Sequence, residues 1–284
     1  MTRQCGLILL LIASGLAISL PADERESGQV RRVSRLKQPI REWFQPQHFD
    51  AGDDLYSQIT LVTSLDDARL AEKITRRGVQ ALKWCYGTNS EWSEGLADYD
   101  RRQCAPFLDG QPFRFAGVGI DEWNPGDPRY PTEKDLAAHG FRAARAEWPD
   151  SIMIGWVTQP DATFIELLRD GTLDLAIIEG YTFIPDVGGL TLAGICEHCD
   201  IFKKANLLDR TIVCFGYLSA TPDQRGRRMT IEELERPVRH IQRQYPEMPG
   251  VAFYGFKDDT PETRDLIRRA DALSGRLYPS KAPM

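Results

Sequence analysis

The sequence predicts an α/β fold, a parallel (β/α)8 barrel that is complete or has one degenerate or missing unit. Three observations lead to this prediction. Short apolar runs alternate with stretches of helical period along the chain. The body that follows the first 37 residues has about 245 residues, which suits one barrel domain. No glycine-rich phosphate motif follows a predicted strand, which disfavours the alternative, an open doubly wound sheet with a nucleotide cofactor.

Seven runs are predicted as strands because each is short and rich in apolar or β-branched residues, and most are bounded by Gly, Pro or Asp. They cover residues 58–63, 79–86, 113–121, 152–157, 173–183, 211–218 and 251–256. One strand is missing from a closed eightfold barrel. We expect it within residues 40–49 or inside the irregular segment 87–112.

Helical periodicity occurs between these runs, in residues 66–77, 131–148, 161–169, 190–208, 231–245 and 261–277. Thr230 precedes the fifth of these stretches, and Glu233 follows three residues later, which is the sequence signature of a capping box. A regular order of strand, helix, strand and helix favours a parallel sheet whose faces are covered by helices.

Residues 1–22 have the features of a secretory signal peptide. Arg3 precedes an apolar run over residues 7–20, and Ala17-Ile18-Ser19 is a small-residue cleavage pattern, so we expect cleavage after Ser19 or Ala22. The run is short for a transmembrane span, and an uncleaved N-terminal anchor is the alternative. The sequence therefore predicts a secreted or periplasmic protein without stable membrane insertion.

The next segment, residues 23–41, is polar and basic with little to bury, and it is predicted to be a flexible linker before a single barrel domain over residues 42–284. The formal net charge of −6 for the whole chain disfavours a nucleic-acid partner. A metal site is not expected, because the four histidines lie in predicted helices or near the N-terminus. No cofactor is predicted, and the sequence carries no signal for an oligomeric state.

The residues at the carboxyl ends of the predicted strands are the candidate ligand-binding residues, because these ends meet around one opening in a barrel. Aromatic, amide and charged side chains at this rim suit a polyhydroxylated ligand, since sugar C–H faces stack on aromatic rings. We therefore predict a carbohydrate substrate. The candidates are Lys83, Trp84, Tyr86, Trp123, Trp156, Gln159, Tyr181, Tyr217, Tyr254 and Asp258.

Three acids at the same strand ends are the candidate catalytic residues. Glu179 lies inside an otherwise apolar run, where an unpaired carboxylate is unfavourable, and a structural salt bridge is the alternative explanation. Asp121 and Glu122 end the third predicted strand. Strict alternation points Asp121 into the barrel, but a chain that leaves the strand here could present Glu122 instead. Both remain candidates as the partner of Glu179.

The strand-terminal acids Asp121 and Glu122, together with the Glu179-Gly180-Tyr181 strand and the last predicted strand, resemble a TIM-barrel glycoside hydrolase, loosely the family-18 chitinase group. The resemblance implies two carboxylates that flank a glycosidic bond. One gives a proton to the leaving oxygen, and the other acts as nucleophile or as base for water.

The family-18 signature Asp-x-x-Asp-x-Asp-x-Glu is not intact in this chain. When the signature is ended on Glu122, its three aspartate positions are occupied by Phe115, Val118 and Ile120. Only the general hydrolase class therefore carries over, and not the substrate-assisted chitinase mechanism.

Three further interpretations stay open at this point. The barrel could bind glycans without cleaving them. Lys83 lies on a predicted strand and could form a Schiff base, as in lyases and aldolases. Cys85 and Cys104 could form a disulfide across the segment after their strand, and free buried thiols are the alternative.

The N-terminal pattern makes the first testable prediction. The protein expressed with its leader should be found outside the cytoplasm with a new N-terminus near Leu20 or Asp23, as read by mass spectrometry of the intact protein. A cytoplasmic protein that retains residues 1–20 would contradict it.

Overall fold

The eight strands of the structure, a computed structural model, pair in parallel and in sequence order to form a closed barrel. They are β1 (Ile40–Phe44), β2 (Leu61–Thr63), β3 (Gln80–Cys85), β4 (Gly117–Trp123), β5 (Ile152–Val157), β6 (Leu175–Glu179), β7 (Thr211–Gly216) and β8 (Gly250–Tyr254). The structure describes residues 22–36, 38–44, 55–63, 68–85, 115–123, 133–180, 191–216, 228–254 and 260–279. The predicted (β/α)8 barrel is confirmed.

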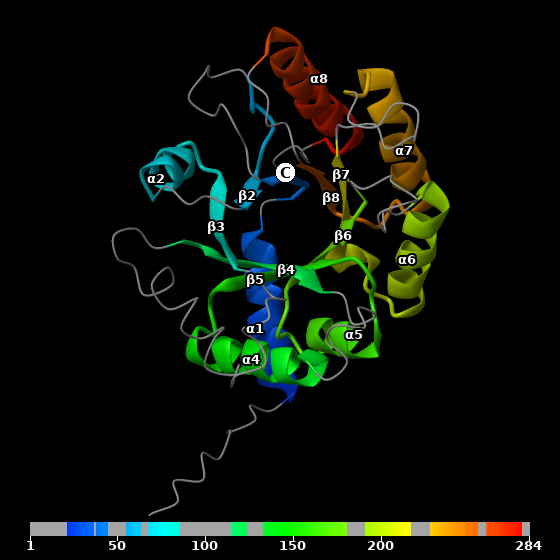
Figure 1. The fold of residues 1–284 in the computed structure, drawn as a ribbon. Coiled ribbons are helices and arrows are strands. Elements are labelled where there is room, and N and C mark those ends of the chain that lie inside the picture. The colour runs from blue at the N-terminus through cyan, green and yellow to red at the C-terminus, as the bar shows by residue number, and fades with distance from the viewer. Residues whose placement is uncertain are drawn as a thin grey trace, which may run out of the picture.

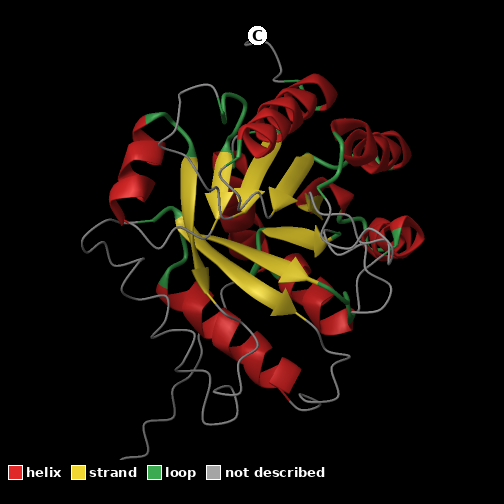
Figure 2. Cartoon of the chain, turned by 45° about the horizontal axis from the view of Figure 1, so that its top comes forward, coloured by secondary structure: helices red, strands yellow, loops and turns green. Residues whose placement is uncertain are grey.

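Helices surround the strands on the outside of the barrel (Figures 1 and 2). They are α2 (Ala68–Arg76), α4 (Glu133–Glu147), α5 (Ala162–Arg169), α6 (Leu192–Lys204), α7 (Ile231–Gln244) and α8 (Pro261–Leu277), with a short 3-10 helix η3 (Leu208–Arg210) before β7. The capping box predicted from Thr230 and Glu233 is present at the start of α7. Within the described residues, none of the helices has the length and apolar character that a membrane crossing needs.

Strand β1 is the eighth strand that the sequence pattern did not identify, and it lies in one of the two segments where it was expected. It closes the barrel by pairing with β2 on one side and with β8 on the other, from Ile40 opposite Gly250 to Phe44 opposite Tyr254. The barrel therefore begins at Ile40, two residues before the predicted domain boundary.

Alternation along the strands separates two hydrophobic cores. An inner core fills the barrel with residues such as Ile154, Trp156 and Ile177, and an outer core lies between the strands and the helices. Neighbouring residues of one strand thus face opposite cores. This parity decides which strand residues can reach a ligand inside the barrel.

Helix α1 (Ala22–Arg35) occupies most of the segment that was predicted to be a flexible linker. The Gln29 amide donates hydrogen bonds to the carbonyl oxygens of Leu168 at 2.7 Å and Leu173 at 3.1 Å. Leu36, just after the helix, packs in the inner core. In Figure 1, α1 (blue) runs behind β4 and β5. Helix α1 and Leu36 therefore close the amino-terminal end of the barrel.

Asp174, directly before β6, connects α1 to the barrel and is fully buried. One carboxylate oxygen accepts from Arg32 Nε at 2.8 Å, and the other accepts from Arg145 Nη2 at 2.8 Å and from the Met153 N–H at 2.9 Å. Two guanidinium groups and a backbone amide thus compensate one buried carboxylate. Helices α1 and α4 and strand β5 are held to the start of β6 by this one side chain.

The linker prediction differs from the structure for a physical reason. The side chains that α1 buries most fully, Gln29 and Arg32, are polar and are satisfied by carbonyl oxygens and a carboxylate instead of by apolar contacts. Arg32 Nη2 donates to the Gly171 carbonyl at 2.7 Å. A helix whose buried face is hydrophilic gives no hydrophobic periodicity for sequence analysis to detect.

The Asp174 network predicts a large effect for one arginine of α1 and a small effect for its neighbour. Arg32→Ala removes a buried ion-pair partner and should lower the free energy of unfolding by about 3 kcal/mol, because Arg145 still compensates Asp174. Arg31→Ala, at an exposed position, is the matched control and should change it by less than about 0.5 kcal/mol. Urea denaturation of both variants measures the difference. Equal small effects would mean that the segment behaves as a linker.

Candidate active site

Glu179 is the last residue of β6 and lies at the carboxyl-terminal end of the barrel. It has the same parity as Leu175 and Ile177, both of which belong to the inner core, so its side chain faces the barrel interior. The side chain is 4% exposed. The structure therefore has a buried carboxyl group inside the barrel, at the end where barrel enzymes bind their ligands.

The chain after Glu179 is held close to its neighbours. The Gly180 N–H donates to the Cys214 carbonyl oxygen on β7 at 2.9 Å. A Cβ at Gly180 would lie 2.9 Å from Ile195 Cδ1 on α6 and 3.0 Å from that carbonyl oxygen. A residue with a side chain at this position would push the strand away from α6, so the glycine fixes where β6 ends and where Glu179 lies.

Asp121 and Glu122 lie in an irregular part of β4. Ile120 pairs with Gly155 and Trp123 pairs with Val157, so two residues of β4 stand opposite one residue of β5, Trp156. This two-against-one count is that of a β-bulge, a feature common beside active sites. Because a bulge interrupts strict alternation, the sequence could not decide which acid faces inward. The side chains of both acids lie outside the part of the chain that the structure describes.

The backbones that carry these acids are two strand spacings apart. Strand β5 pairs with β4 on one side and with β6 on the other. At about 4.8 Å per spacing, the backbones at the bulge and at Glu179 are roughly 10 Å apart. Two inward-facing carboxyl groups on such strands are within the separation of about 5–10 Å that glycoside hydrolysis requires.

A second buried acid, Glu42 on β1, also faces the barrel interior, because it has the same parity as Ile40 of the inner core. It was not among the predicted site residues. The register runs from Glu42 to Ala252 on β8, then to Cys214 on β7, then to Glu179 on β6. Glu42 is fully buried, and the Thr63 hydroxyl on β2 is a polar group that acts on its carboxyl group. Strand β1 has only five residues, and two of them, Arg41 and Glu42, are charged. Such a segment does not have the pattern of a strand, so sequence analysis identified neither β1 nor Glu42.

Burial changes the protonation of Glu42 and of Cys214. It raises the pKa of Glu42 from an ordinary value of 4.5 to about 8, and the Thr63 hydroxyl opposes this rise only in part. The pKa of the Cys214 thiol is raised well above its usual range, first by burial and then by the carboxylates of Glu42 and Glu179. Glu42 is therefore a neutral acid at pH 7, and the thiol between the two acids is also neutral.

Two aromatic candidates face the interior. Trp156 on β5 is fully buried in the inner core, and Tyr254 on β8 is half-buried against it. Gln159, just after β5, is exposed. Tyr86, Tyr181, Tyr217 and Asp258 lie outside the described residues, and so does the side chain of Trp84. Trp156 is therefore part of the inner core below the mouth, whereas Tyr254 and Gln159 are partly open to a ligand.

The structure places Trp123 on the outer face of the barrel, not at the ligand site where the sequence analysis put it. Its ring lies 6.2 Å from that of Phe141 and 5.7 Å from that of Phe164, and its Nε1 donates to Asp161 at 3.1 Å. The extra residue of the bulge reverses the alternation after Asp121 and Glu122, which turns Trp123 toward α4 and α5. Its indole stabilises the outer core.

Lys83 also has outward parity. It pairs with Val118, which belongs to the outer core, and its neighbour Leu82 belongs to the inner one. A Schiff-base lysine must reach a substrate at the barrel interior or mouth, so this position removes the basis for the lyase alternative and for Lys83 as a substrate-binding residue.

The described part of the chain contains no cluster of three or more His, Cys, Asp or Glu that could hold a metal ion. Cys196, Cys199 and Cys214 are free thiols. The predicted disulfide between Cys85 and Cys104 falls on side chains outside the described residues. That pairing stays a prediction.

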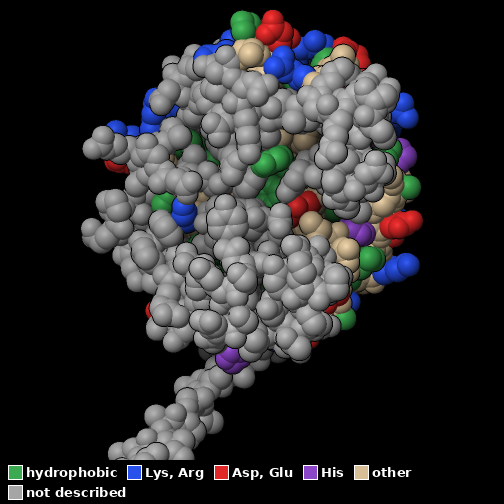
Figure 3. Space-filling model, viewed as in Figure 1, with side chains coloured by type: hydrophobic (Ala, Val, Ile, Leu, Met, Phe, Trp, Pro, Cys, Tyr) green, Lys and Arg blue, Asp and Glu red, His purple; other side chains and the backbone are tan. Residues whose placement is uncertain are grey.

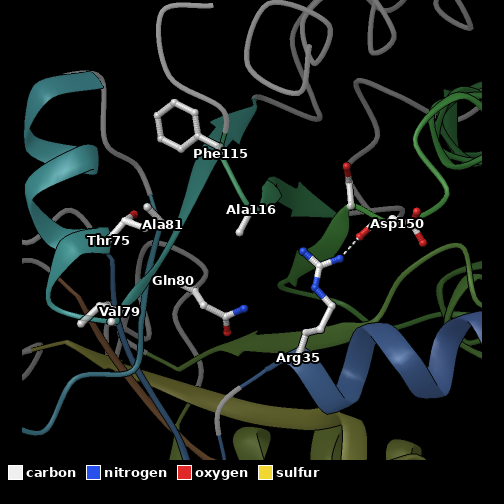
Figure 4. A pocket seen from close by; sticks show the side chains of 10 residues that line it. Arg35, Thr75, Val79, Gln80, Ala81, Phe115, Ala116 and Asp150 are labelled. Carbon is white, nitrogen blue, oxygen red and sulfur yellow. Dashed lines mark hydrogen bonds between the residues drawn. The ribbon is translucent and has the colours of Figure 1, made fainter. Parts of the chain in front are cut away.

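A hollow of about 340 Å³ lies at the opposite end of the barrel, beside the beginnings of β3, β4 and β5 (Figure 4). Gln80, Ala116 and Ser151 line it, and Arg35 donates a hydrogen bond to the Asp150 carbonyl oxygen at its edge. Figure 3 shows another face, where acidic and hydrophobic side chains are visible in a central opening. Because barrel enzymes bind substrates at the carboxyl ends of strands, the hollow is not the candidate site.

Comparison with known proteins supports the fold. No protein-family profile matches the chain, and no curated sequence matches it. Among solved structures, a chitinase of glycoside hydrolase family 18 from Pseudoalteromonas aurantia is similar with a TM-score of 0.58 and 14% identity, over 82% of this chain and 99% of that one. The fold is shared with TIM-barrel glycoside hydrolases.

Two further structures show how widely this fold is used. An endo-β-N-acetylglucosaminidase from Cordyceps militaris is similar with a TM-score of 0.54 and 14% identity, over 89% of this chain and 96% of that one. A family-10 xylanase from Thermobacillus composti is similar with a TM-score of 0.53 and 12% identity, over 85% of this chain and 98% of that one. These proteins are named for different substrates, so the likeness establishes the barrel and leaves the reaction to be argued from the site.

The pKa of Glu42 makes a prediction about stability. Between pH 4.5 and 8 the folded protein holds a proton that the unfolded chain has released. The stabilisation from this group is therefore complete below pH 4.5 and is lost as the pH rises toward 8, at up to about 1.4 kcal/mol per pH unit. Glu42→Gln removes this loss, so the variant should gain stability relative to the wild type between pH 5 and pH 8.

Urea denaturation at several pH values measures this difference. The exposed Glu166→Gln on α5 is the matched control and should keep a constant difference from the wild type. A Glu42→Gln difference that does not change with pH would show that Glu42 is ionised in the folded protein.

Proposed function

We propose that the protein is an exported glycoside hydrolase that acts on a poly- or oligosaccharide through a pair of carboxyl groups at the carboxyl-terminal mouth of the barrel. The observation that carries the proposal is the position of Glu179, buried and inward-facing at the end of β6. The bulge of β4 carries two more acids at the same end, with one strand, β5, between β4 and β6. Export rests on the N-terminal sequence pattern.

The proposed chemistry needs two carboxyl groups in different protonation states. One gives its proton to the leaving glycosidic oxygen while the other, ionised, attacks the anomeric carbon or activates a water molecule. Glu179 is one member, and Asp121 or Glu122 is the other. A site inside a closed barrel suits this division of roles, because burial raises carboxyl pKa values and keeps an acid protonated at neutral pH.

The surroundings of Glu179 support a sugar as the ligand. The half-buried ring of Tyr254 on β8 belongs to the same interior, and the exposed amide of Gln159 follows β5. An aromatic ring can stack on the C–H face of a sugar, and an amide can pair with its hydroxyl groups. The inward-facing positions of the described strands hold no Lys, Arg or His, which favours a neutral ligand over an anionic one.

The proposal predicts that Glu179→Gln lowers turnover by roughly two to four orders of magnitude, because the amide keeps the shape of the side chain and removes its charge and proton. A screen of polysaccharides for released reducing ends, with the protein over residues 22–284, identifies the substrate for this test. Glu166→Gln is the control and should retain wild-type turnover, since Glu166 is exposed on α5.

Two outcomes would contradict the proposal in different ways. A folded Glu179→Gln variant with unchanged turnover would remove Glu179 from the catalytic pair and leave Asp121 and Glu122 to be tested. Binding of glycans with no turnover by the wild type would favour the alternative function, a carbohydrate-binding barrel that does not cleave its ligand.

A further inference from the structure

We propose that the amino-terminal end of the barrel is a docking surface for an anionic lipid membrane, to which the protein binds peripherally and without insertion. This end lies opposite the candidate site, so the docking does not depend on the proposed hydrolase function. The surface, called the basic end surface below, consists of six basic side chains of α1, α5, α6, η3, α7 and α8. They are Arg31, Arg169, Lys204, Arg210, Arg243 and Arg276.

The topology of the barrel brings these six residues to one end. Each outer helix runs back from the carboxyl end of one strand to the amino end of the next, so all the last helical turns lie at the amino-terminal end. Arg169, Lys204, Arg243 and Arg276 occupy such last turns and are exposed. Helix α1 lies across the same end, and Arg31 is exposed on it because the next residue, Arg32, is the one that turns inward to Asp174.

Ion pairing distinguishes this end from the sides of the barrel. On the sides, Arg239 pairs with Glu235 on α7, and Arg269 on α8 pairs with Glu232 on α7. In the same two helices, Arg243 and Arg276 have no carboxylate partner among the described residues. The positive charge is therefore compensated on the sides and is left uncompensated at the amino-terminal end.

The other members of the basic end surface follow the same rule. Arg169 and Arg210 each donate to a backbone carbonyl oxygen, at 3.4 Å and 3.3 Å, which satisfies a donor but does not neutralise the charge. Arg31 and Lys204 have no ion pair within the described part of the chain. The helix dipole favours basic residues in last turns, but it does not explain why their acidic partners are absent. A net charge of −6 for the chain makes this local excess of cations more unusual.

An exposed apolar side chain beside these cations favours a membrane over other anionic partners. Val30, next to Arg31 on α1, is 56% exposed, and it is the only large hydrophobic side chain classed as exposed in the described residues. A hollow of about 470 Å³ adjoins it, lined by Val33 of α1 and by Arg210. Apolar and basic side chains on one outward helix face are typical of helices that lie at a membrane surface. A soluble polyanion would need the charges alone.

Docking at this end also orients the barrel. The apolar run of residues 7–20 leads directly into α1, so export across a membrane leaves this end of the barrel beside that membrane. The mouth with Glu179 then faces away from the lipid. Such an orientation keeps the candidate site open to a large ligand.

Cosedimentation of the exported protein with lipid vesicles tests this inference. Vesicles of phosphatidylcholine with phosphatidylglycerol should bind the protein at low salt and release it in about 0.5 M NaCl, because salt screens the attraction. Vesicles of phosphatidylcholine alone should not bind it. Arg31→Glu/Lys204→Glu should weaken binding to the anionic vesicles at least about tenfold, since each reversal replaces an attraction by a repulsion.

The matched control is Arg236→Glu/Arg269→Glu, which gives the same net charge from exposed positions on the sides of α7 and α8. It should bind the anionic vesicles within about threefold of the wild type. Thermal unfolding followed by circular dichroism checks that both variants are folded.

Three outcomes would overturn the docking surface. Equal weakening in the two variants would mean that only the overall charge matters. Equal binding to neutral vesicles would assign the attachment to the apolar run of residues 7–20. Binding to heparin without binding to anionic vesicles would identify a soluble polyanion as the partner. Each outcome is read without a saccharide, so it is independent of whether the hydrolase function holds.

Discussion

Closure of the barrel is the constraint on which the rest of the structure depends, and it requires two close approaches between strands. A Cβ at Gly250, where β8 meets β1, would lie 1.7 Å from the Ile40 carbonyl oxygen. A Cβ at Gly117, where β4 meets β5, would lie 1.8 Å from the Ile152 carbonyl oxygen. Only glycine fits at these strand starts. Once closed, the barrel turns alternate residues of each strand into one shared interior, and this brings Glu42 next to residues more than 130 positions away.

The amino-terminal end of the barrel contributes to stability, and the carboxyl-terminal end carries the candidate site. At the amino-terminal end, Asp174 fixes α1 through Arg32, and Leu36 packs into the inner core. The described strands then fill the interior with apolar side chains up to the level of Trp156. Beyond them, Glu179 lies at the carboxyl end of β6 and is buried. A buried acid above an apolar core is unfavourable for stability, and such unfavourable placements are expected where the protein performs chemistry. Stability and function are thus separated along the barrel axis.

Much of the fold could be predicted from the sequence because most elements follow a hydrophobic period. Strands such as β5 and β7 are continuous apolar runs, and α7 begins at the predicted capping box. The elements that are held by polar contacts were not predicted. Helix α1 buries Gln29 and Arg32, and β1 carries Glu42 inside the barrel, so neither has an apolar pattern. The inward position of Glu179 could be foreseen, whereas the outward turn of Trp123 depends on a bulge that no sequence period reveals.

The central claim is that Glu179 and an acid of the β4 bulge work as a pair on one sugar, at the carboxyl-terminal mouth. A crystal structure of the protein with a bound oligosaccharide tests it most directly. The account predicts that the sugar lies at this mouth, with the carboxyl groups of Glu179 and of Asp121 or Glu122 about 5–10 Å apart on either side of one glycosidic bond. Carboxyl groups much farther apart than this, or a sugar bound at the amino-terminal hollow beside Gln80, would contradict it.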